Sequence, residues 1–395
     1  MSRITCSAEI DLVVYGATGF TGRLIAQRLA QRWGPGSGIS WGIAGRSEQK
    51  LAAVREEIGR QSDVSLIMAS ADDPASLEAL AARTKMVITT VGPYQLYGAP
   101  LVAACARSGT DYLDLAGETA WMRSMIDAHD AQAKASGARI LFSCGFDSIP
   151  FESGVLYLQD AAREQFGHPV SRVKARVRRL DGGFSSGTHA SARATATSAR
   201  DPGVLALLQD PFCLTPGFAG PKQPLSEGAL YDPDLESWTA PFIMAPINTR
   251  NVHRSNFLQA HAYGADLVYD EMLVTGPGDQ GEAIARSIAA DAHPMRGKGG
   301  PRLGKELCPE ARQAGGFDIL FIGVDRDGRQ IRAAVTGDSD PGYVSTSKMI
   351  TETAICLKEA EDVPGGMWTP AAALGSRLLD RLSALAGLTF QIEAA

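Results

Sequence analysis

DLVVYGATGFTG, residues 11–22, is the stretch that decides the fold. An apolar run leads into three glycines spaced three residues apart, and an amphipathic segment follows, which predicts a strand, a tight turn and a helix. Such a turn directs the unpaired N–H groups of a helix N-terminus at one point, and the missing side chains let a pyrophosphate approach the backbone. The stretch therefore predicts a dinucleotide-binding turn. Its residues are Gly16, Ala17, Thr18, Gly19, Phe20, Thr21 and Gly22.

Strands and helices alternate from this turn to about residue 150. The further predicted strands are residues 39–44, 64–69, 86–91, 112–115 and 139–143. Short strands joined through helices imply right-handed crossovers and a parallel sheet with both faces covered. The spacing G-x-x-G-x-x-G is a weak signal alone, but this context strengthens it. We predict an α/β, Rossmann-type doubly wound domain over residues 1–150, with its ligand beyond the carboxyl ends of the strands.

An arginine and a serine, Arg46 and Ser47, follow the second predicted strand. At this place a protein that prefers NAD usually carries an acid for the ribose 2′-OH. Arg46 offers instead a planar cation that suits a 2′-phosphate, and the Ser47 hydroxyl lies beside it. The alternative is a solvated loop arginine. The pair favours NADP over NAD as the cofactor.

The fourth predicted strand ends in Val91-Gly92-Pro93-Tyr94. Gly92 permits close approach of the cofactor, and Pro93 fixes the chain. Tyr94 would then lie near the nicotinamide, with a phenol that could donate a hydrogen bond or a proton. A packed loop tyrosine is the alternative. We assign Val91, Gly92 and Pro93 to the cofactor site and Tyr94 to the candidate catalytic set.

Polar residues also follow the last two predicted strands. Glu118 lies where it could cap the next helix, which is a more frequent role than catalysis. Asp147 and Ser148 precede a helix and could cap it, and Asp147 is also assigned to the cofactor site. Cys144 could be a nucleophile, but a small buried apolar residue is the favoured interpretation.

Composition bounds the remaining possibilities. A chain of 395 residues exceeds the usual size of one core, so two domains are expected. The net charge of -6, without a long basic tract, argues against nucleic-acid binding. The six cysteines are scattered without a C-x-x-C pair, so we expect no metal site and a reduced, cytoplasmic protein. No apolar run approaches the roughly 18–20 residues of a membrane span, and residues 1–10 contain no apolar leader segment.

The second half, residues 151–340, predicts an α+β domain with a mixed or antiparallel sheet for substrate and dimer contacts. Residues 316–324 and 330–335 predict a hairpin through Asp327-Gly328. Residues 170–180 predict a strand whose Lys174, Arg176 and Arg178 form one basic face. A solvated face is the favoured interpretation, and docking of an acidic acyl-carrier partner is the alternative.

The rest of the second half is less regular. Residues 211–246 are rich in proline and glycine, which indicates a lid or a wrapping loop. The apolar side chains in this segment could line a substrate channel or belong to the core; they are Trp238, Phe242 and Met244. Residues 344–359 and 371–386 predict two helices near the end of the chain.

The motifs GATGFTG, AGRS, TVGPY, YLDLAGE and CGFDSIP occur in this order, and the chain resembles the saccharopine dehydrogenase-like oxidoreductases. Within them it is similar to the trans-acting enoyl reductases, through residues 240–250, 339–354 and 365–375. The resemblance implies NADP-dependent reduction of double bonds in lipid or polyketide intermediates made by a separate synthase. It also implies that residues 341–395 pack back on the first domain. We separately expect a homodimer.

The leading hypothesis is hydride transfer from NADPH to an activated C=C bond. Such a reaction needs a proton donor and hydrogen bonds to the developing enolate oxygen. Our candidates are Tyr94, His189 and Arg250. His189 stands where the resemblance predicts a small residue, and the alternative is a structural histidine. For Arg250 the alternative is a purely structural role in holding a loop.

Two alternatives stay open. Saccharopine-like oxidoreduction of a C–N bond would need convergent arginines for substrate carboxylates, and Arg176, Arg193 and Arg250 are available. A non-catalytic NADP-binding protein would be indicated by an obstructed nicotinamide pocket.

Overall fold

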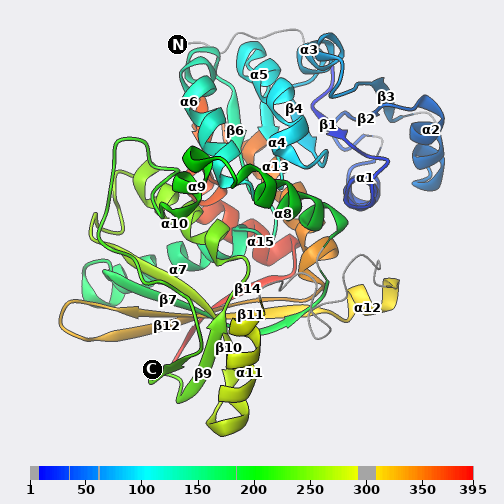
Figure 1. The fold of residues 1–395 in the computed structure, drawn as a ribbon. Helices are drawn as coiled ribbons and strands as arrows, with labels where there is room; N and C mark the ends of the chain where they lie inside the picture. Colours follow the sequence, from blue (N-terminus) through cyan, green and yellow to red (C-terminus); the bar gives the residue numbers. More distant parts are fainter. Residues whose placement is uncertain (1–8, 35, 61–62, 184, 292–307, 395) are drawn as a thin grey trace.

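A computed structural model describes residues 9–34, 36–60, 63–183, 185–291 and 308–394. The cysteine at position 6 lies outside them. Two sheets organise the chain, and Figure 1 shows the first sheet with its helices, in blue to cyan, above the second sheet. The helices α8 (Ser186–Ser198) and α9 (Pro202–Gln209) lie between the two sheets in this view.

The first sheet has seven parallel strands in the order β13-β6-β5-β4-β1-β2-β3. The strands are β1 (Leu12–Tyr15), β2 (Trp41–Gly45), β3 (Ser65–Met68), β4 (Met86–Thr89), β5 (Asp111–Leu113), β6 (Arg139–Leu141) and β13 (Gly366–Trp368). Alternate residues of β1 enter two different apolar clusters, Leu12 and Val14 in one, Val13 and Tyr15 in the other. Both faces are therefore buried, and the predicted Rossmann-type fold is confirmed.

Helices connect these strands as the alternation predicts. They are α1 (Phe20–Arg32), α2 (Glu48–Glu57), α3 (Pro74–Arg83), α4 (Tyr94–Tyr97), α5 (Ala99–Ser108) and α6 (Thr119–Ser136). The strand order reverses at β1, which pairs with β2 on one side and with β4 on the other. A crevice opens at such a switch point, so the ends of β1 and β4 mark the expected ligand site.

The second sheet has seven strands in the order β14-β12-β11-β7-β10-β9-β8. They are β7 (Arg172–Asp181), β8 (Leu230–Asp232), β9 (Ser237–Pro241), β10 (Val268–Gly276), β11 (Gly316–Val324), β12 (Gln330–Gly337) and β14 (Leu388–Glu393). Among the described strands of this sheet, only β7 and β10 pair in parallel, so the predicted mixed sheet is confirmed. The hairpin of β11 and β12 is also confirmed, with Gly328 in the left-handed region at φ +81°.

The remaining helices surround this sheet or return to the first one. They are α7 (Ile149–Phe166), α10 (Ala245–Leu258), α11 (Gly278–Ala290), α12 (Pro309–Gln313), the π-helical turn η1 (Pro341–Ser345), α13 (Thr346–Glu359), α14 (Pro370–Leu374) and α15 (Ser376–Leu385). The tail helix predicted over residues 371–386 is interrupted at Gly375, whose φ of +57° suits a glycine. No helix of the described residues is long and apolar enough to cross a bilayer.

The basic residues of β7 are engaged by carboxylates of this same chain. Lys174 pairs with Asp232 and Asp234, and Arg176 pairs with Asp232 and Asp270. Arg178 pairs with Asp318 and Glu393 at 2.7 Å each. The predicted solvated face therefore holds for Arg178, which is exposed, but not for Arg176, which is buried. Because carboxylates across the sheet neutralise all three bases, the described residues do not support the alternative of a free basic surface for an acyl-carrier partner.

The chain after η1 contributes to both sheets. The strand β13 extends the first sheet beside β6, and β14 extends the second beside β12. Helix α13 packs on α1, where the fully buried Glu352 pairs with Arg28, Arg32 and Arg381. The domain limits at residues 150 and 340 stay a prediction.

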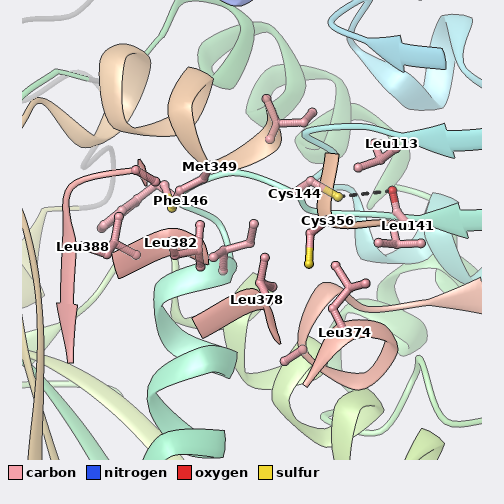
Figure 2. Packing of buried hydrophobic residues seen from close by; sticks show 14 of the residues in the cluster. Leu113, Leu141, Cys144, Phe146, Met349, Cys356, Leu374, Leu378, Leu382 and Leu388 are labelled. Atoms are coloured by element: carbon pink, nitrogen blue, oxygen red, sulfur yellow. Dashed lines mark hydrogen bonds between the residues drawn. The ribbon is translucent and has the colours of Figure 1, made fainter. Parts of the chain in front are cut away.

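Cys144 lies in the apolar core, in agreement with the favoured interpretation. Figure 2 shows its thiol near the Leu141 carbonyl, with Leu113 and Cys356 among the apolar side chains around it, and the Sγ–O distance is 3.5 Å. Burial raises the pKa of this thiol well above its ordinary value. A thiol that resists ionisation and has no exposed surface is not suited to nucleophilic attack.

The buried carboxyl of Glu152, in α7, makes stability depend on pH. Its Oε2 accepts from Ser255 and Ala371, Oε1 has no partner among the described residues, and burial raises its pKa to about 8. The folded state therefore binds this proton more tightly than the unfolded state, so the stabilisation is complete below pH ~4.5 and is lost as the pH rises through about 8. We expect this carboxyl to lower the free energy of unfolding by about 2 kcal/mol between pH 6 and pH 8.5.

The Glu152→Gln variant should show a pH dependence weaker by that amount, because glutamine imitates the neutral acid. Urea unfolding at the two pH values measures the difference. Glu78→Gln, at a carboxylate that is 58% exposed, is the control and should behave like the unaltered protein. An unchanged pH dependence in Glu152→Gln would contradict the buried neutral acid.

Candidate functional site

The glycine turn between β1 and α1 is closed by its own backbone. Gly16 has φ +90°, its N–H donates to the Ala44 carbonyl, and its carbonyl accepts from the N–H of Gly19 at 2.9 Å. A Cβ at Gly22 would lie 2.3 Å from the Gly16 oxygen, so only glycine fits there. The turn is therefore shaped by close backbone approach, as the sequence predicts.

This turn fits a cofactor pyrophosphate. Helix α1 begins at Phe20, and no side chain of the described part of the chain caps it. The first N–H groups of a helix have no partner inside it, and they attract an anion together with the helix dipole. A Cβ built on Gly19 would meet only the Gly16 carbonyl, at 3.3 Å, so the approach to these N–H groups is open on that side.

Arg46 and Ser47 follow β2 at the same edge of the sheet. Because Tyr15 pairs with Ala44, the residues after β2 lie beside the glycine turn. The Arg46 side chain is exposed, and Ser47 caps α2 by accepting from the N–H of Lys50. This placement agrees with a 2′-phosphate site, which stays a prediction.

A cavity of about 700 Å³ lies beyond the carboxyl ends of β1, β4, β5 and β6. Gly19, Phe20 and Thr21 of the glycine turn contribute to its wall, as do Thr90 and Gly92 after β4. The second half of the chain closes it with residues of α8, α10 and η1. The cavity therefore lies at the switch point, between the glycine turn and the second sheet, where a nicotinamide and its substrate would meet.

Tyr94 reaches the cavity wall, but its phenol is engaged elsewhere. The hydroxyl donates to the Thr89 carbonyl at 3.0 Å and accepts from the Leu115 N–H at 3.2 Å. Its ring stacks on Trp121, and burial raises the pKa of the phenol well above its ordinary value. This geometry fits the packed-tyrosine alternative. Of its neighbours, Val91 donates its N–H to Thr89, and the cavity wall includes Gly92 but neither Val91 nor Pro93.

Glu118 holds three parts of the wall together. Its carboxylate accepts from the N–H groups of Tyr94 and Gly117, at 2.9 and 3.0 Å, and from the Ser191 hydroxyl at 2.7 Å. No side chain caps α6, so the predicted capping role of Glu118 is wrong. The reason is that the carboxylate faces α4 and α8 instead.

His189 and Arg250 occupy different positions relative to the cavity. The cavity wall includes Thr188 and Ser191 of α8 but not His189, whose pKa is lowered by burial and by Arg193. Arg250 of α10 contributes to the wall, while its two terminal nitrogens donate to the carbonyls of Pro246, at 2.6 Å, and Leu208. Arg250 thus links α10 to α9, as the loop-holding alternative expects.

Asp147 is the carboxyl that faces the cavity without a hydrogen bond on its buried oxygen. Its Oδ1 is buried and has no partner among the described residues. Burial raises the pKa of Asp147 to about 7, and burial likewise raises that of Glu271 behind it in β10, with the charge of Asp147 adding to the effect. No side chain caps α7, so the suggested capping roles of Asp147 and Ser148 are wrong. A carboxyl with a pKa near neutrality can donate a proton.

Several wall residues could not be selected from the sequence. One face of α8 contributes Ser191, Ala192 and Thr195, and η1 contributes Tyr343. Thr346 accepts from the N–H of Phe146 at 3.0 Å, so α13 supports the loop that carries Asp147. Small residues at helical spacing in α8 were the available signal, but they carry no chemical label.

Comparison with known proteins defines the class. Residues 12–141 match the family described as the saccharopine dehydrogenase NADP binding domain, so the cofactor is NADP. Two solved structures share the fold. Saccharopine dehydrogenase (L-Glu forming) from Saccharomyces cerevisiae has a TM-score of 0.54 and 12% identity, and the match covers 98% of this chain and 100% of that one. Homospermidine synthase from Legionella pneumophila has a TM-score of 0.55 and 11% identity, and the match covers 98% of this chain and 92% of that one. The protein is an oxidoreductase with an NADP-binding domain of the saccharopine dehydrogenase type.

The curated relatives narrow the class to a family. A Mycobacterium tuberculosis protein, provisionally named a trans-acting enoyl reductase, is 39% identical over 97% of this chain and 97% of its own length. The trans-acting enoyl reductases of Mycobacterium ulcerans and Mycobacterium bovis are each 36% identical over 95% of this chain and 96% of theirs. The chain belongs to the trans-acting enoyl reductase family.

Proposed function

We propose that this protein uses NADPH to reduce an electron-poor C=C bond in a lipid or polyketide acyl intermediate that a separate synthase presents. The observation that carries the proposal is the cavity wall, where Asp147 lies among apolar groups. Leu115, Ile243 and Ile247 contribute to this wall, as does Met244 of the predicted channel residues. Apolar surroundings suit an acyl chain, and the acid suits the proton that the reduction requires.

The chemistry divides between the cofactor and Asp147. Bound NADPH supplies a hydride to the β-carbon of the unsaturated thioester. Asp147 gives its proton to the α-carbon, so the double bond gains two hydrogens, and water returns a proton to the carboxylate. Tyr94 and Arg250 act as supports of the wall, because their polar atoms bind the backbone. The cytoplasmic location and the homodimer stay predictions.

Oxidoreduction of a C–N bond is less well supported. It would need arginines that converge on substrate carboxylates, but Arg176 is paired with two aspartates in the second sheet. Arg193 is exposed and lies outside the cavity wall, and Arg250 donates to two backbone carbonyls. A non-catalytic role would be expected with an obstructed nicotinamide pocket, whereas a cavity of about 700 Å³ lies beyond the carboxyl ends of the strands.

NADPH oxidation measured with unsaturated acyl thioesters tests the proposal. We expect loss of NADPH absorbance with 2-enoyl thioesters carried by acyl carrier protein or by N-acetylcysteamine, and a product two mass units heavier. The saturated thioesters are the matched control and should be inert. Silence across chain lengths, or oxidation only with a keto acid and an amine, would contradict the proposal.

A further inference from the structure

Arg312 lies over the Phe20 ring at the start of α1, although it comes from the second half of the chain. It is part of α12, which precedes β11 of the second sheet. Its guanidinium carbon is 4.6 Å from the centre of the Phe20 ring. Phe20 is the first residue of α1, directly after Gly19. Figure 1 shows α12 on the same side of the molecule as α1.

The backbone around η1 holds Arg312 in this place. The Arg312 carbonyl accepts from the N–H of Asp340 at 2.9 Å. The Asp340 carboxylate accepts from the N–H groups of Gly183 and Tyr343, at 3.1 and 2.8 Å. The ring of Tyr343 also packs edge-on against Phe20, with ring centres 4.6 Å apart. Phe20 therefore contacts two residues from the second half of the chain.

Two nitrogen donors of the Arg312 guanidinium have no hydrogen-bond partner among the described residues. They are Nε and Nη1, and both are buried. A guanidinium stays charged at physiological pH, and leaving buried donors of a charged group unpaired is costly. Nε and Nη1 point in different directions, so one anion can take only one of them; a phosphate oxygen would satisfy that donor and offset the charge of the guanidinium.

We infer that Arg312 binds the pyrophosphate of the cofactor from the side opposite the glycine turn. The pyrophosphate is the anion expected at the N-terminus of α1, next to Phe20. Arg312 does not contribute to the cavity wall, so a contact with the nicotinamide or the substrate is not favoured. The cofactor is then held by both sheets of the molecule, since α12 leads into β11.

The binding of three ligands distinguishes the contact made by Arg312 from the contact predicted for Arg46. NADPH and NADH both carry the pyrophosphate, whereas adenosine 2′-phosphate carries only the phosphate that Arg46 is predicted to bind. Arg312→Gln should weaken the binding of NADPH and of NADH by about 10-fold each. It should weaken the binding of adenosine 2′-phosphate by less than about 2-fold. Fluorescence titration measures the affinities of the two dinucleotides, and displacement of bound NADPH measures the affinity of adenosine 2′-phosphate.

Two further variants complete the experiment. Arg312→Lys keeps a positive charge but loses the fork of donors, so an intermediate loss is expected. Arg326→Gln, at a side chain that is 79% exposed and paired with Asp266, is the matched control and should bind all three ligands normally. Unchanged dinucleotide affinity in Arg312→Gln would overturn the inference, and so would an equal loss for adenosine 2′-phosphate. Because the readout is binding, failure of enoyl reduction would not affect the result.

Discussion

Replacement of Asp147 by asparagine is expected to lower kcat for an enoyl thioester by about 100-fold or more, with the Kd of NADPH changed by less than about 2-fold. The amide keeps the shape of the neutral acid but has no proton to give to the α-carbon. In the unaltered protein, kcat should fall as the pH rises through about 7, because only the protonated carboxyl donates. Steady-state kinetics and NADPH titration measure the two quantities.

Asp127→Asn serves as the control, since this carboxylate is 51% exposed on α6 and pairs with Arg123. It should leave kcat and the Kd unchanged. The sequence assigned Asp147 to the cofactor site, and the same experiment separates that role from proton donation. A weaker NADPH affinity with kcat preserved would support the cofactor role and contradict the proposed donor.

The Arg46→Asp variant is expected to lose NADPH affinity by about 10- to 100-fold, while NADH affinity stays within a few-fold of the original. The reason is that the guanidinium would bind only the 2′-phosphate, and the new carboxylate would repel it. Fluorescence titration with both cofactors measures the two affinities.

Lys50→Asp is the matched control for Arg46→Asp, because it makes the same change of charge on the exposed surface of α2. It should weaken the binding of NADPH only slightly, because solvent and salt screen the changed charge. Equal losses of NADPH and NADH in Arg46→Asp would remove the argument that this arginine selects the cofactor.

Six strands of the first sheet could be predicted because their information is local, whereas β13 was not predicted. Most of its strands are short runs of largely apolar residues, and Gly22 is required by the Gly16 oxygen within the same turn. The steric need for Gly16 is not local, because a Cβ there would meet Thr90 and Val91. The mixed second sheet could be predicted from its hairpin and alternating strand. The short β8 and β9 could not, because a proline-rich segment with little alternation surrounds them.

The candidate site could be predicted only where neighbouring residues form it. Gly19, Phe20 and Thr21 of the turn lie in the cavity wall together with Gly92, and their cofactor role stays a prediction. The engagement of Tyr94 and Glu118 could not be foreseen, because the partners Leu115 and Ser191 come from other elements. The ion pairs of β7 could not be foreseen for the same reason, since Arg176 meets Asp232 and Asp270 from strands that lie far from it in the sequence.

The placement of β13 and β14 has a consequence for folding. Each lies at one edge of its sheet, beside β6 or β12, and both follow every other described strand in chain order. Until β13 and β14 pair, the edges of β6 and β12 have unpaired backbone groups that can pair with other chains. Protection of these edges would therefore matter most in the interval between the folding of the earlier strands and the pairing of β13 and β14.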